Sequence, residues 1–513
     1  MNKVAENNRR IAKNTLFLYL RMILVMAVSL YTSRVILKAL GVDDFGLYGV
    51  IGGIVALFSI LSGSLTSAIS RFLTYELGKG NSQRLKQIFS SSVFIQLMIS
   101  LVVILALAPL GLWFINAKLN VPPDRYVAAY WVFGFSILTF CLHLLSVPYN
   151  AAIISHEKMA VFSYISLIEV SFKLLIAYCI NLFAQNRLII YAAMLFGVVL
   201  VIQLIYAGYC IRKFPECKLS LAYDRGLLKE IGSFAGWNFI GSAAGVLRNQ
   251  GNNIILNLFY GTVANAAYSI CMQVNNAVNQ LADNFMVSVN PQITKYYAQS
   301  EIKEMNNLMF RSARMSFFLS WLLASVILLN TEYILNLWLA KIPDHTVIFV
   351  QLILWFTITE SVSKPLITGM LATGKIKNYQ IVVGGLQMLN LPISYVLLKL
   401  GAAPQAPLAV SIGVSLACLS ARLVMLRGLM PFDSMAFIKK VILRVILVGA
   451  LSFAVPYFIK LFVGETSGFI TFLWESAVCL CWTVAVIYYI GCDNNERRFI
   501  RDRIVAAKHK FIK

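Results

Sequence analysis

The chain has 513 residues, of which 59% are hydrophobic and only 13% are charged. Soluble domains carry about 25% charged residues, so this composition excludes an ordinary soluble protein. The net charge of +22 would suggest nucleic acid as a partner if the chain were soluble. The cationic residues are instead distributed as in a membrane protein, and no nucleic-acid partner is expected.

Long apolar blocks follow one another along the whole chain, separated by short polar segments. A transmembrane helix needs about 20 mostly apolar residues, so the pattern predicts an all-α polytopic membrane protein with about 14 transmembrane helices. No segment between two blocks is long enough for a soluble domain, and the first block is too long for the core of a cleavable signal peptide. We expect the spans at residues 14–37, 47–69, 89–115, 126–149, 159–183, 188–210, 233–256, 264–289, 312–338, 346–370, 379–398, 406–426, 439–461 and 469–490.

The lysine and arginine residues fall unevenly on the two sides of the predicted membrane. With a cytoplasmic N-terminus, 33 of the 44 cationic residues lie in cytoplasmic segments or in the adjoining parts of spans, and 7 lie in the corresponding positions on the opposite side. The other four are Arg21, Arg34, Lys173 and Arg248, which are assigned to the spans themselves. Because cytoplasmic loops carry an excess of Lys and Arg, this asymmetry predicts that both termini are cytoplasmic and that the number of spans is even. We expect a multi-pass protein of the bacterial inner (plasma) membrane, with its positive charge facing the anionic cytoplasmic lipids.

The sequence repeats itself weakly at a distance of 220 residues. This shift places Gly41 on Gly261 and Tyr48 on Tyr268 without a gap, and both copies read as a span, a short glycine-bearing turn, a span and a basic loop. Each copy starts on the same side of the membrane because six spans separate them, which predicts a parallel repeat. We expect six-helix bundles at residues 1–215 and 216–430, two additional transmembrane helices at 431–490, and a cytoplasmic tail at 491–513. The tail is read as a basic amphipathic helix, with a frayed tail as the alternative.

One segment of the first copy resembles a known family. Residues 33–48, SRVILKALGVDDFGLY, are followed by two glycines at 52–53 and by Arg-Phe-Leu at 71–73. This resembles the N-terminal signature of Wzx-type polysaccharide flippases, and residues 290–293 (NPQI) with 295–298 (KYYA) resemble the matching region of their second half.

The resemblance implies a fold and a function. These flippases belong to the multidrug/oligosaccharidyl-lipid/polysaccharide exporter superfamily and share the MATE-like fold. It further implies that undecaprenyl-pyrophosphate-linked oligosaccharide repeat units are moved across the inner membrane for lipopolysaccharide O-antigen or capsule. The substrate follows only by analogy, because one fold serves several cargoes.

Polar residues inside the predicted spans indicate a cavity, because a charge in hydrocarbon costs at least about 2.5–3.5 kcal/mol. The span at 264–289 carries polar residues at i, i+3, i+7, i+10 and i+11, which is one face of a helix. These residues are Gln273, Asn276, Gln280, Asp283 and Asn284, and the span at 233–256 adds Asn249, Asn252 and Asn253. We expect both faces to line a water-filled cavity in which amides meet sugar hydroxyls. Hydrogen bonding between helices is the alternative.

Cations within the spans are candidates for binding the lipid pyrophosphate, since guanidinium groups grip phosphate with two hydrogen bonds. They are Arg21, Arg34, Lys173 and Arg248. Arg34 and Arg248 lie near the ends of their spans and could instead reach the interface. Lys173 follows Glu169 by one helical turn and could form a structural pair. Asp283 is the candidate residue for coupling to an ion gradient.

The sequence carries no pattern of catalysis or of metal binding. Its four histidines lie on different spans or loops and lack metal-ligand spacing. We expect His143 to be packed inside its bundle, with proton coupling as the alternative. Glu360 and Lys364 are one turn apart and are expected to form a structural pair. No phosphate-binding glycine loop is present, so neither ATP nor another cofactor is expected.

Three other functions compete with the flippase. A multidrug exporter of the same fold would need acids for cationic drugs, whereas several interior charges here are cations. A membrane-embedded glycosyltransferase or ligase would carry a catalytic loop with acids, but the longest segment between spans, about 211–232, is basic. A non-transporting scaffold leaves the polar stripe unexplained. We therefore predict a transporter rather than an enzyme, with lipid-linked oligosaccharide and the bilayer as partners and the polysaccharide polymerase machinery as a further candidate partner.

Overall fold

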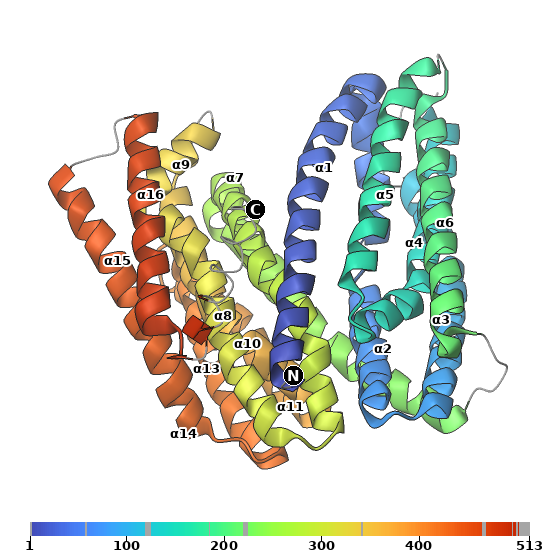
Figure 1. Cartoon of the computed structure of the whole chain (residues 1–513). Helices are drawn as coiled ribbons and strands as arrows, with labels where there is room; N and C mark the ends of the chain where they lie inside the picture. The colour runs from blue at the N-terminus through green and yellow to red at the C-terminus, as the bar shows by residue number, and fades with distance from the viewer. Residues whose placement is uncertain are drawn as a thin grey trace, which may run out of the picture. The chain divides into compact units, whose positions relative to one another are not determined.

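The computed structural model describes residues 3–56, 59–117, 125–183, 185–218, 224–339, 342–463, 468–494, 496–498 and 501, and within these residues it contains helices and no β-strand (Figure 1). Eleven of the helices are long and apolar enough to cross a membrane. The predicted class, an all-α polytopic membrane protein, is therefore confirmed. Most of the predicted amphipathic tail lies outside the described residues.

Three predicted spans are not among the eleven. The span at 47–69 crosses residues 57 and 58, which the structure does not describe. The spans at 233–256 and 264–289 both fall on the long helix α7 (Arg225–Ala298). Asparagine, glutamine and glycine residues lower the hydropathy of α7, and this helix is not among the eleven.

The helices form two compact units. Unit 1 comprises Met1–Ala243, Val287–Glu301 and Gly374–Gln380, and unit 2 comprises Ala244–Met286, Ile302–Thr373 and Ile381–Lys513. The last turns of α7 and the first turn of α11 thus belong to unit 1, although they come late in the sequence. The predicted division into bundles at residue 215 rests on the repeat and stays a prediction.

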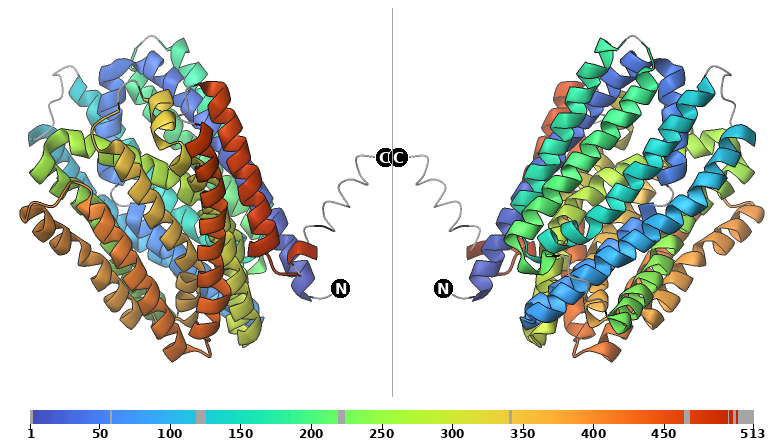
Figure 2. Two further views of the ribbon diagram at one scale, coloured as in Figure 1. Left: turned by 90° about the vertical axis from the view of Figure 1, so that its left-hand side faces the viewer. Right: turned by 90° about the vertical axis from the view of Figure 1, so that its right-hand side faces the viewer.

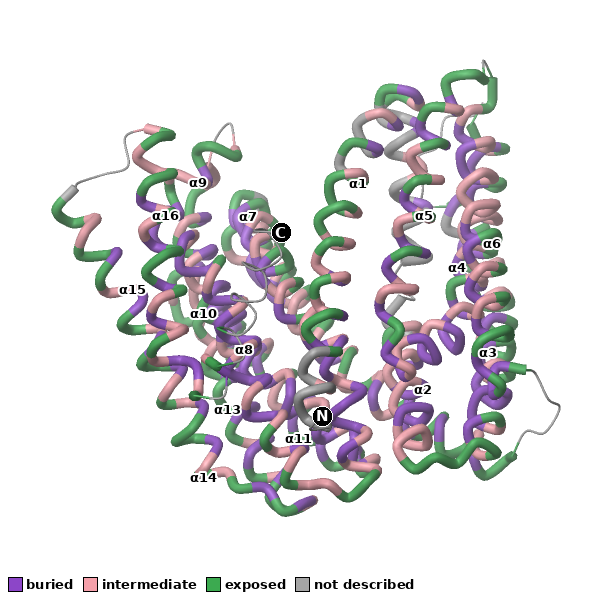
Figure 3. Tube along the Cα trace, viewed as in Figure 1, coloured by how far each residue is buried: buried purple, intermediate pink, exposed green. Residues whose placement is uncertain are grey.

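Unit 1 is built around α4, which packs against α1, α2, α3, α5 and α6 and supplies a large part of the buried core (Figures 1 and 3). The apolar residues Ala129, Val132, Phe133 and Leu144 of α4 are all buried. The helices of unit 1 before α7 are α1 (Lys3–Ala56), α2 (Ser59–Lys79), α3 (Ser82–Ala117), α4 (Tyr126–Ser155), α5 (Met159–Cys179) and α6 (Arg187–Lys213), with short 3-10 turns at Ile180–Leu182 and Pro215–Cys217.

Two glycines interrupt the longest helices. Gly41 in α1 has φ 81° and ψ 171°, and Gly261 in α7 has φ 69° and ψ −162°. This backbone region is essentially restricted to glycine. The two positions are those that the 220-residue shift superimposes, so the glycine-bearing turn predicted in each copy is present with nearly the same dihedral angles.

A buried carboxylate joins three segments of unit 1. Glu157 lies in the turn between α4 and α5, with φ 58° and a side chain that is 1% exposed. Its Oε2 accepts hydrogen bonds from Arg10 Nε of α1 at 2.7 Å and from Gln292 Nε2 of α7 at 2.5 Å, and its Oε1 pairs with Lys295 of α7. The Glu157 carbonyl accepts a hydrogen bond from Asn14 Nδ2 at 3.0 Å. Both carboxylate oxygens therefore have a charged donor, which is the condition for burying an acid.

The same turn holds the segment between α6 and α7. His156 Nε2 lies 2.5 Å from Glu216 Oε1, and the imidazole stacks on the ring of Phe214 at 4.0 Å. Glu216 is buried, and burial raises the pKa of its carboxyl. The hydrogen bond from His156 and a backbone hydrogen bond lower this pKa by more than burial raises it, so that it ends below its ordinary value.

In unit 2, α10 packs against both α8 and α13, and α15 and α16 pack against each other and against α8 (Figure 2). Arg314 of α8 is 4% exposed and binds Asp493 at 2.6 Å and Glu496 at 2.9 Å, which fastens the segment after α16 to α8. The remaining helices are α8 (Ile302–Leu329), α9 (Thr331–Trp338), α10 (Thr346–Thr373), α11 (Lys377–Met388), α12 (Asn390–Lys399), α13 (Ala406–Leu429), α14 (Ser434–Phe437), α15 (Leu443–Val463) and α16 (Phe469–Val486), with π-helical turns at Ile438–Ile442 and Ile487–Gly491.

Candidate functional site

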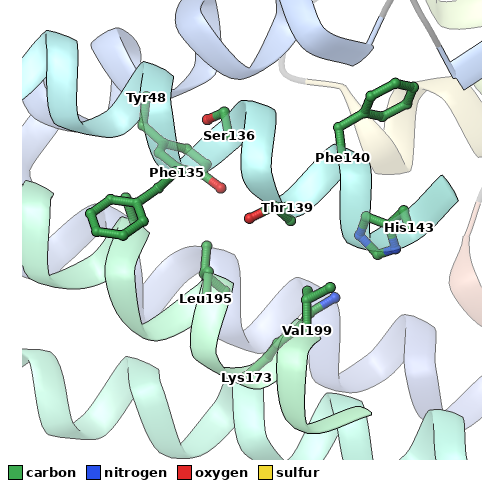
Figure 4. A pocket seen from close by; sticks show the side chains of 10 residues that line it. Tyr48, Phe135, Ser136, Thr139, Phe140, His143, Lys173, Leu195 and Val199 are labelled. Atoms are coloured by element: carbon green, nitrogen blue, oxygen red, sulfur yellow. The ribbon is translucent and has the colours of Figure 1, made fainter. Parts of the chain in front are cut away.

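Two adjoining cavities lie within unit 1. The first, here the Arg21 cavity, has an empty volume of about 560 Å³ and is lined by Arg21, Leu142, His143, Ser146, Asn150, Phe162, Ser166, Glu169, Val199, Ile202, Gln203 and Tyr206. The second, here the Tyr48 cavity, has an empty volume of about 760 Å³ and is lined by Tyr48, Phe135, Ser136, Thr139, Phe140, His143, Lys173, Ala192, Leu195 and Val199 (Figure 4). His143 and Val199 line both cavities, so the two cavities share a wall.

Arg21 is the cation of the first cavity. Its guanidinium lies 4.7 Å from the centre of the Phe162 ring, a cation–π contact, and its buried Nε has no hydrogen-bond partner among the described residues. Such a guanidinium retains donors for a ligand. A side chain predicted to lie deep in its span thus faces a cavity that Asn150 and Gln203 also line.

Lys173 is the cation of the second cavity. Its Nζ binds Glu169 Oε1 at 2.6 Å, one turn earlier on α5, and the two side chains are 39% and 24% exposed. The ion pair anticipated from the sequence is therefore present. Both members of the pair also face cavities. Lys173 lines the Tyr48 cavity, and Glu169 lines the Arg21 cavity. The two cavities together hold two permanent cations and one carboxylate, so their net charge is positive.

The expectation that His143 would be packed inside its bundle is wrong. His143 is exposed and forms a wall of both cavities. It belongs to a polar stripe on α4 at i, i+3, i+7, i+10 and i+14, which the sequence analysis missed. The stripe comprises Ser136, Thr139, His143, Ser146 and Asn150. The same helical spacing that singled out the 264–289 span would have found it.

The predicted stripe on α7 is exposed. Gln273, Asn276 and Gln280 are exposed and make no side-chain hydrogen bond within the part of the chain that the structure describes. Asn284 is partly buried and has a polar or ring partner. Contacts from α10 reach both the stripe, where Lys364 pairs with Asp283, and the neighbouring face, where Thr357 Oγ1 donates to Asn275 Oδ1 at 2.6 Å. The assignment of the stripe to a substrate cavity stays a prediction.

The asparagines of the 233–256 span are bonded within unit 2. Asn252 is 1% exposed, and its Nδ2 donates to Ser411 Oγ at 3.4 Å. Asn253 Oδ1 accepts from Asn265 at 2.8 Å, and the Asn249 carbonyl accepts from a tyrosine hydroxyl. This is the interhelical hydrogen bonding considered as the alternative for this span. We do not carry these three residues into the proposal below.

The remaining cations have different surroundings. Arg248 lies 4.6 Å from the centre of the Phe356 ring, and its Nε donates to Asn249 Oδ1 at 3.3 Å. The backbone at Arg34 is helical, and its side chain lies outside the described part of the chain. Arg248 belongs to unit 2 and is not among the residues that line the two cavities of unit 1.

The expected pair of Glu360 with Lys364 is replaced by two other contacts in unit 2. Lys364 pairs with Asp283 across from α10 to α7, and Asp283 is 58% exposed. Glu360 accepts a hydrogen bond from Ser415 Oγ and lies 3.9 Å from Arg422. Acids and cations on neighbouring helices compensate each other here, which the sequence spacing along a single helix could not show.

The chain is similar in sequence to known protein families. The sequence profile described as polysaccharide biosynthesis protein matches residues 11–297, and the profile described as MatE matches residues 244–396. An uncharacterized membrane protein EpsK of Bacillus subtilis (strain 168) is 22% identical over 297 residues, or 57% of this chain. The match spans 58% of the length of that relative.

Solved transporter structures share the fold. A crystal structure of MATE in the bent conformation has a TM-score of 0.72 at 9% identity, covering 82% of this chain and 96% of that chain. A MOP superfamily transporter from Pyrococcus furiosus has a TM-score of 0.68 at 9% identity, again over 82% and 96%. An outward-facing MATE family transporter has a TM-score of 0.69 at 10% identity, over 84% and 97%. The predicted MATE-like fold is confirmed.

Proposed function

The chain belongs to the polysaccharide biosynthesis protein family of the MOP superfamily, and from this premise we propose that it flips undecaprenyl-pyrophosphate-linked oligosaccharide repeat units across the bacterial inner membrane. Transport would follow alternating access, and the product would enter lipopolysaccharide O-antigen or capsule synthesis. Both termini would be cytoplasmic, and the polysaccharide polymerase machinery would receive the product. A family of transporters for polysaccharide synthesis supports the class of cargo.

The observation that supports an anionic lipid headgroup is the charge of the paired cavities in unit 1. Arg21 and Lys173 lie in neighbouring cavities with a single carboxylate between them. A pyrophosphate diester carries two negative charges, and a partly desolvated cation binds such a group more strongly than a cation in bulk water. The guanidinium of Arg21 lines its cavity and makes no hydrogen bond to another described residue, so its outer nitrogens are available to such a group.

A multidrug exporter is the second candidate, because its relatives share the fold. A cavity for cationic drugs would need an excess of carboxylates, and Glu169 is the only carboxylate that lines either cavity, with Lys173 bound to it. An embedded glycosyltransferase would likewise need acids placed for catalysis. The positive charge of the cavities favours the flippase over both.

The experiment that tests the proposal is deletion of the gene, followed by extraction of lipid-linked oligosaccharides and staining of surface polysaccharide. We expect loss of surface polymer and accumulation of single repeat units on the inner leaflet. Wild type should rescue, and Arg21→Met with Lys173→Met should not. Lys213→Met, a cation at the end of α6 outside both cavities, is the matched control and should rescue. Normal surface polymer with altered drug sensitivity would instead establish the exporter.

A further inference from the structure

We propose that a cleft of unit 2, between α13 and α15, binds one anionic phospholipid. An acyl chain lies in the cleft, and the phosphate binds Arg427, Lys439 and Lys440. Every residue of this site belongs to unit 2, so the site is distinct from the two cavities of unit 1. The inference does not depend on which cargo the protein moves.

The cleft, here the α13–α15 cleft, lies over a floor of large side chains. α15 packs against α8, and α13 packs against α10, but α13 and α15 do not pack closely against each other. Phe317 and Trp321 of α8 line the floor with stacked rings 5.7 Å apart, and Ile358 of α10 lines it beside them. The empty volume is about 1030 Å³. Pockets for small molecules have volumes of about 300–1,000 Å³, so the cleft has room for a ligand at the upper end of that range.

The lining of the α13–α15 cleft is apolar. Thr359 carries its one hydroxyl, which donates to the Trp355 carbonyl at 2.9 Å. The indole of Trp321 is also bonded to the protein, because its Nε1 donates to Ser452 Oγ at 2.7 Å. Apolar cavities stay dry and take up apolar ligands. A hydrocarbon chain therefore suits this lining better than a sugar or a charged group.

The cleft is open along its side. Trp355, Leu416 and Ile446 line it and are 46%, 50% and 61% exposed. Gly449 and Ala450 line it from α15, and their small size leaves space that a larger side chain would fill. The exposed surface of a transmembrane helix faces hydrocarbon in a bilayer. An acyl chain can therefore enter the cleft from the side without crossing water.

Both helices that border the cleft end in exposed cations. Arg427 lies in the last turn of α13, and Lys439 and Lys440 lie in the π-helical turn that leads into α15. Ile442 of the same turn lines the cleft, and single π-helical turns are frequent at functional sites. The three cations make no hydrogen bond or ion pair within the described part of the chain. A headgroup can thus bind them without breaking a contact of the protein.

The nearby acids do not neutralise this end of the cleft. Residues 423–443 contain three cations and one carboxylate, which leaves a net charge of 3 − 1 = +2. The carboxylate is Asp433, which accepts a hydrogen bond from the backbone N–H of Ala436 at 2.9 Å. Asp493 compensates Arg444 instead. The charge distribution of the sequence predicts that this end faces the cytoplasm, where the leaflet holds anionic lipids. An anionic phospholipid matches both the cations and the apolar cleft beside them.

The test measures lipid binding to the purified full-length protein by native mass spectrometry. The probes are phosphatidylglycerol and phosphatidylcholine with the same oleoyl chains, so that they differ only in the headgroup. Lys439→Gln combined with Lys440→Gln removes two exposed cations and leaves the cleft intact. Ala450→Trp fills the cleft and leaves the cations intact.

Each variant has a matched control in unit 1. Arg212→Gln with Lys213→Gln removes two adjacent exposed cations at the end of α6. Ala106→Trp places the same large side chain on α3 outside the cleft. Ala106 and Ala450 are both exposed, so a tryptophan at either position does not enter the protein core.

We expect the wild type to retain one phosphatidylglycerol molecule more tightly than phosphatidylcholine. The lysine variant should weaken phosphatidylglycerol about 10- to 30-fold, the contribution of two cations near a membrane surface, and leave phosphatidylcholine unchanged. Ala450→Trp should weaken both lipids, and both controls should bind as the wild type does. Equal affinity of the wild type for the two lipids, or binding that Ala450→Trp leaves unchanged, would overturn the proposal. Displacement of phosphatidylglycerol by an equal concentration of undecaprenyl pyrophosphate would also overturn it, because the cleft would then hold a prenyl chain.

Discussion

Two regions of unit 1 each place a glutamate beside a lysine. One glutamate is enclosed by protein, and the other lines a cavity. At the turn between α4 and α5, Glu157 is 1% exposed, and both its oxygens are occupied by donors from α1 and α7. In the cavities, Glu169 is 24% exposed, and Lys173 is the one described residue that donates a hydrogen bond to its carboxylate. The first arrangement leaves no acceptor free, whereas the second leaves polar groups facing open space.

This difference separates an ion pair that holds helices from one that can exchange partners. A buried carboxylate is tolerated only while its donors remain, so losing any of them is costly. A partly exposed pair contributes little to stability, because water competes for both groups. The Glu169–Lys173 pair can therefore open toward an anionic ligand without unfolding its surroundings, whereas the Glu157 cluster cannot.

The largest expected effect is that of Glu157→Gln on stability. It removes the charge that compensates Arg10 and Lys295, and breaking a buried pair costs about 3–5 kcal/mol. Thermal unfolding of the detergent-purified protein would measure the loss. Glu169→Gln is the matched variant and should cost less than about 1 kcal/mol. Equal losses for the two variants would erase the distinction between the two regions.

Substitutions in the Glu169–Lys173 pair should change transport strongly, although they change stability little. Lys173→Met should reduce translocation of lipid-linked saccharide at least about 10-fold, since one charge-assisted hydrogen bond contributes about 1.5–3 kcal/mol. The melting temperature should stay close to that of wild type. Translocation can be followed in proteoliposomes with a fluorescent lipid-linked saccharide. Unchanged transport in this variant would remove the cavity from the mechanism.

Exchanging the two charges would sharpen the comparison. Glu169→Lys combined with Lys173→Glu keeps the ion pair on α5 but moves the cation by one turn, into the Arg21 cavity. We expect near-normal stability with impaired translocation, because the Tyr48 cavity then holds a carboxylate. Full translocation by this double variant would show that the pair acts only as a structural link.

Glu216 is buried, as Glu157 is, but its main side-chain partner is the single residue His156. Its pKa is lower in the folded protein than its ordinary value of 4.5. The folded state therefore gains stability from the ionised carboxyl above about pH 4.5, and this gain is lost as the pH falls below that value. Melting temperatures measured from pH 6 to pH 3.5 should decline less steeply for Glu216→Gln. Parallel declines would contradict the assignment.

The smallest stability effect is expected for Asp283→Asn, since Asp283 is 58% exposed although it pairs with Lys364. As the proposed ion-coupling residue, it should instead change how translocation depends on the proton or sodium gradient. Proteoliposomes with imposed gradients would measure this dependence. A variant with unaltered gradient dependence would exclude Asp283 from coupling.

Apolar length and periodicity predicted the fold well because both act along one helix. Apolar length placed the spans, and the matched positions of Gly41 and Gly261 marked both interruptions. The Lys173–Glu169 pair was also predictable, since its residues are one turn apart. Contacts between distant helices were not. Nothing in the local sequence shows that Lys364 would pair with Asp283 rather than with Glu360. Nor does it show that Glu157 would accept hydrogen bonds from α1 and α7. The α4 stripe was readable but was overlooked among apolar residues.

The glycine interruptions also bear on how the chain enters the membrane during synthesis. At Gly41 and Gly261 one helix passes into the next without an intervening loop. No lysine or arginine lies between Arg248 and Lys295, so the connection at Gly261 carries no charge signal that could orient the two spans separately. Such a pair has to insert as one hairpin, its direction set by the basic residues at its two outer ends. A lysine pair introduced beside Gly261 should therefore oppose insertion of the whole hairpin rather than of a single span.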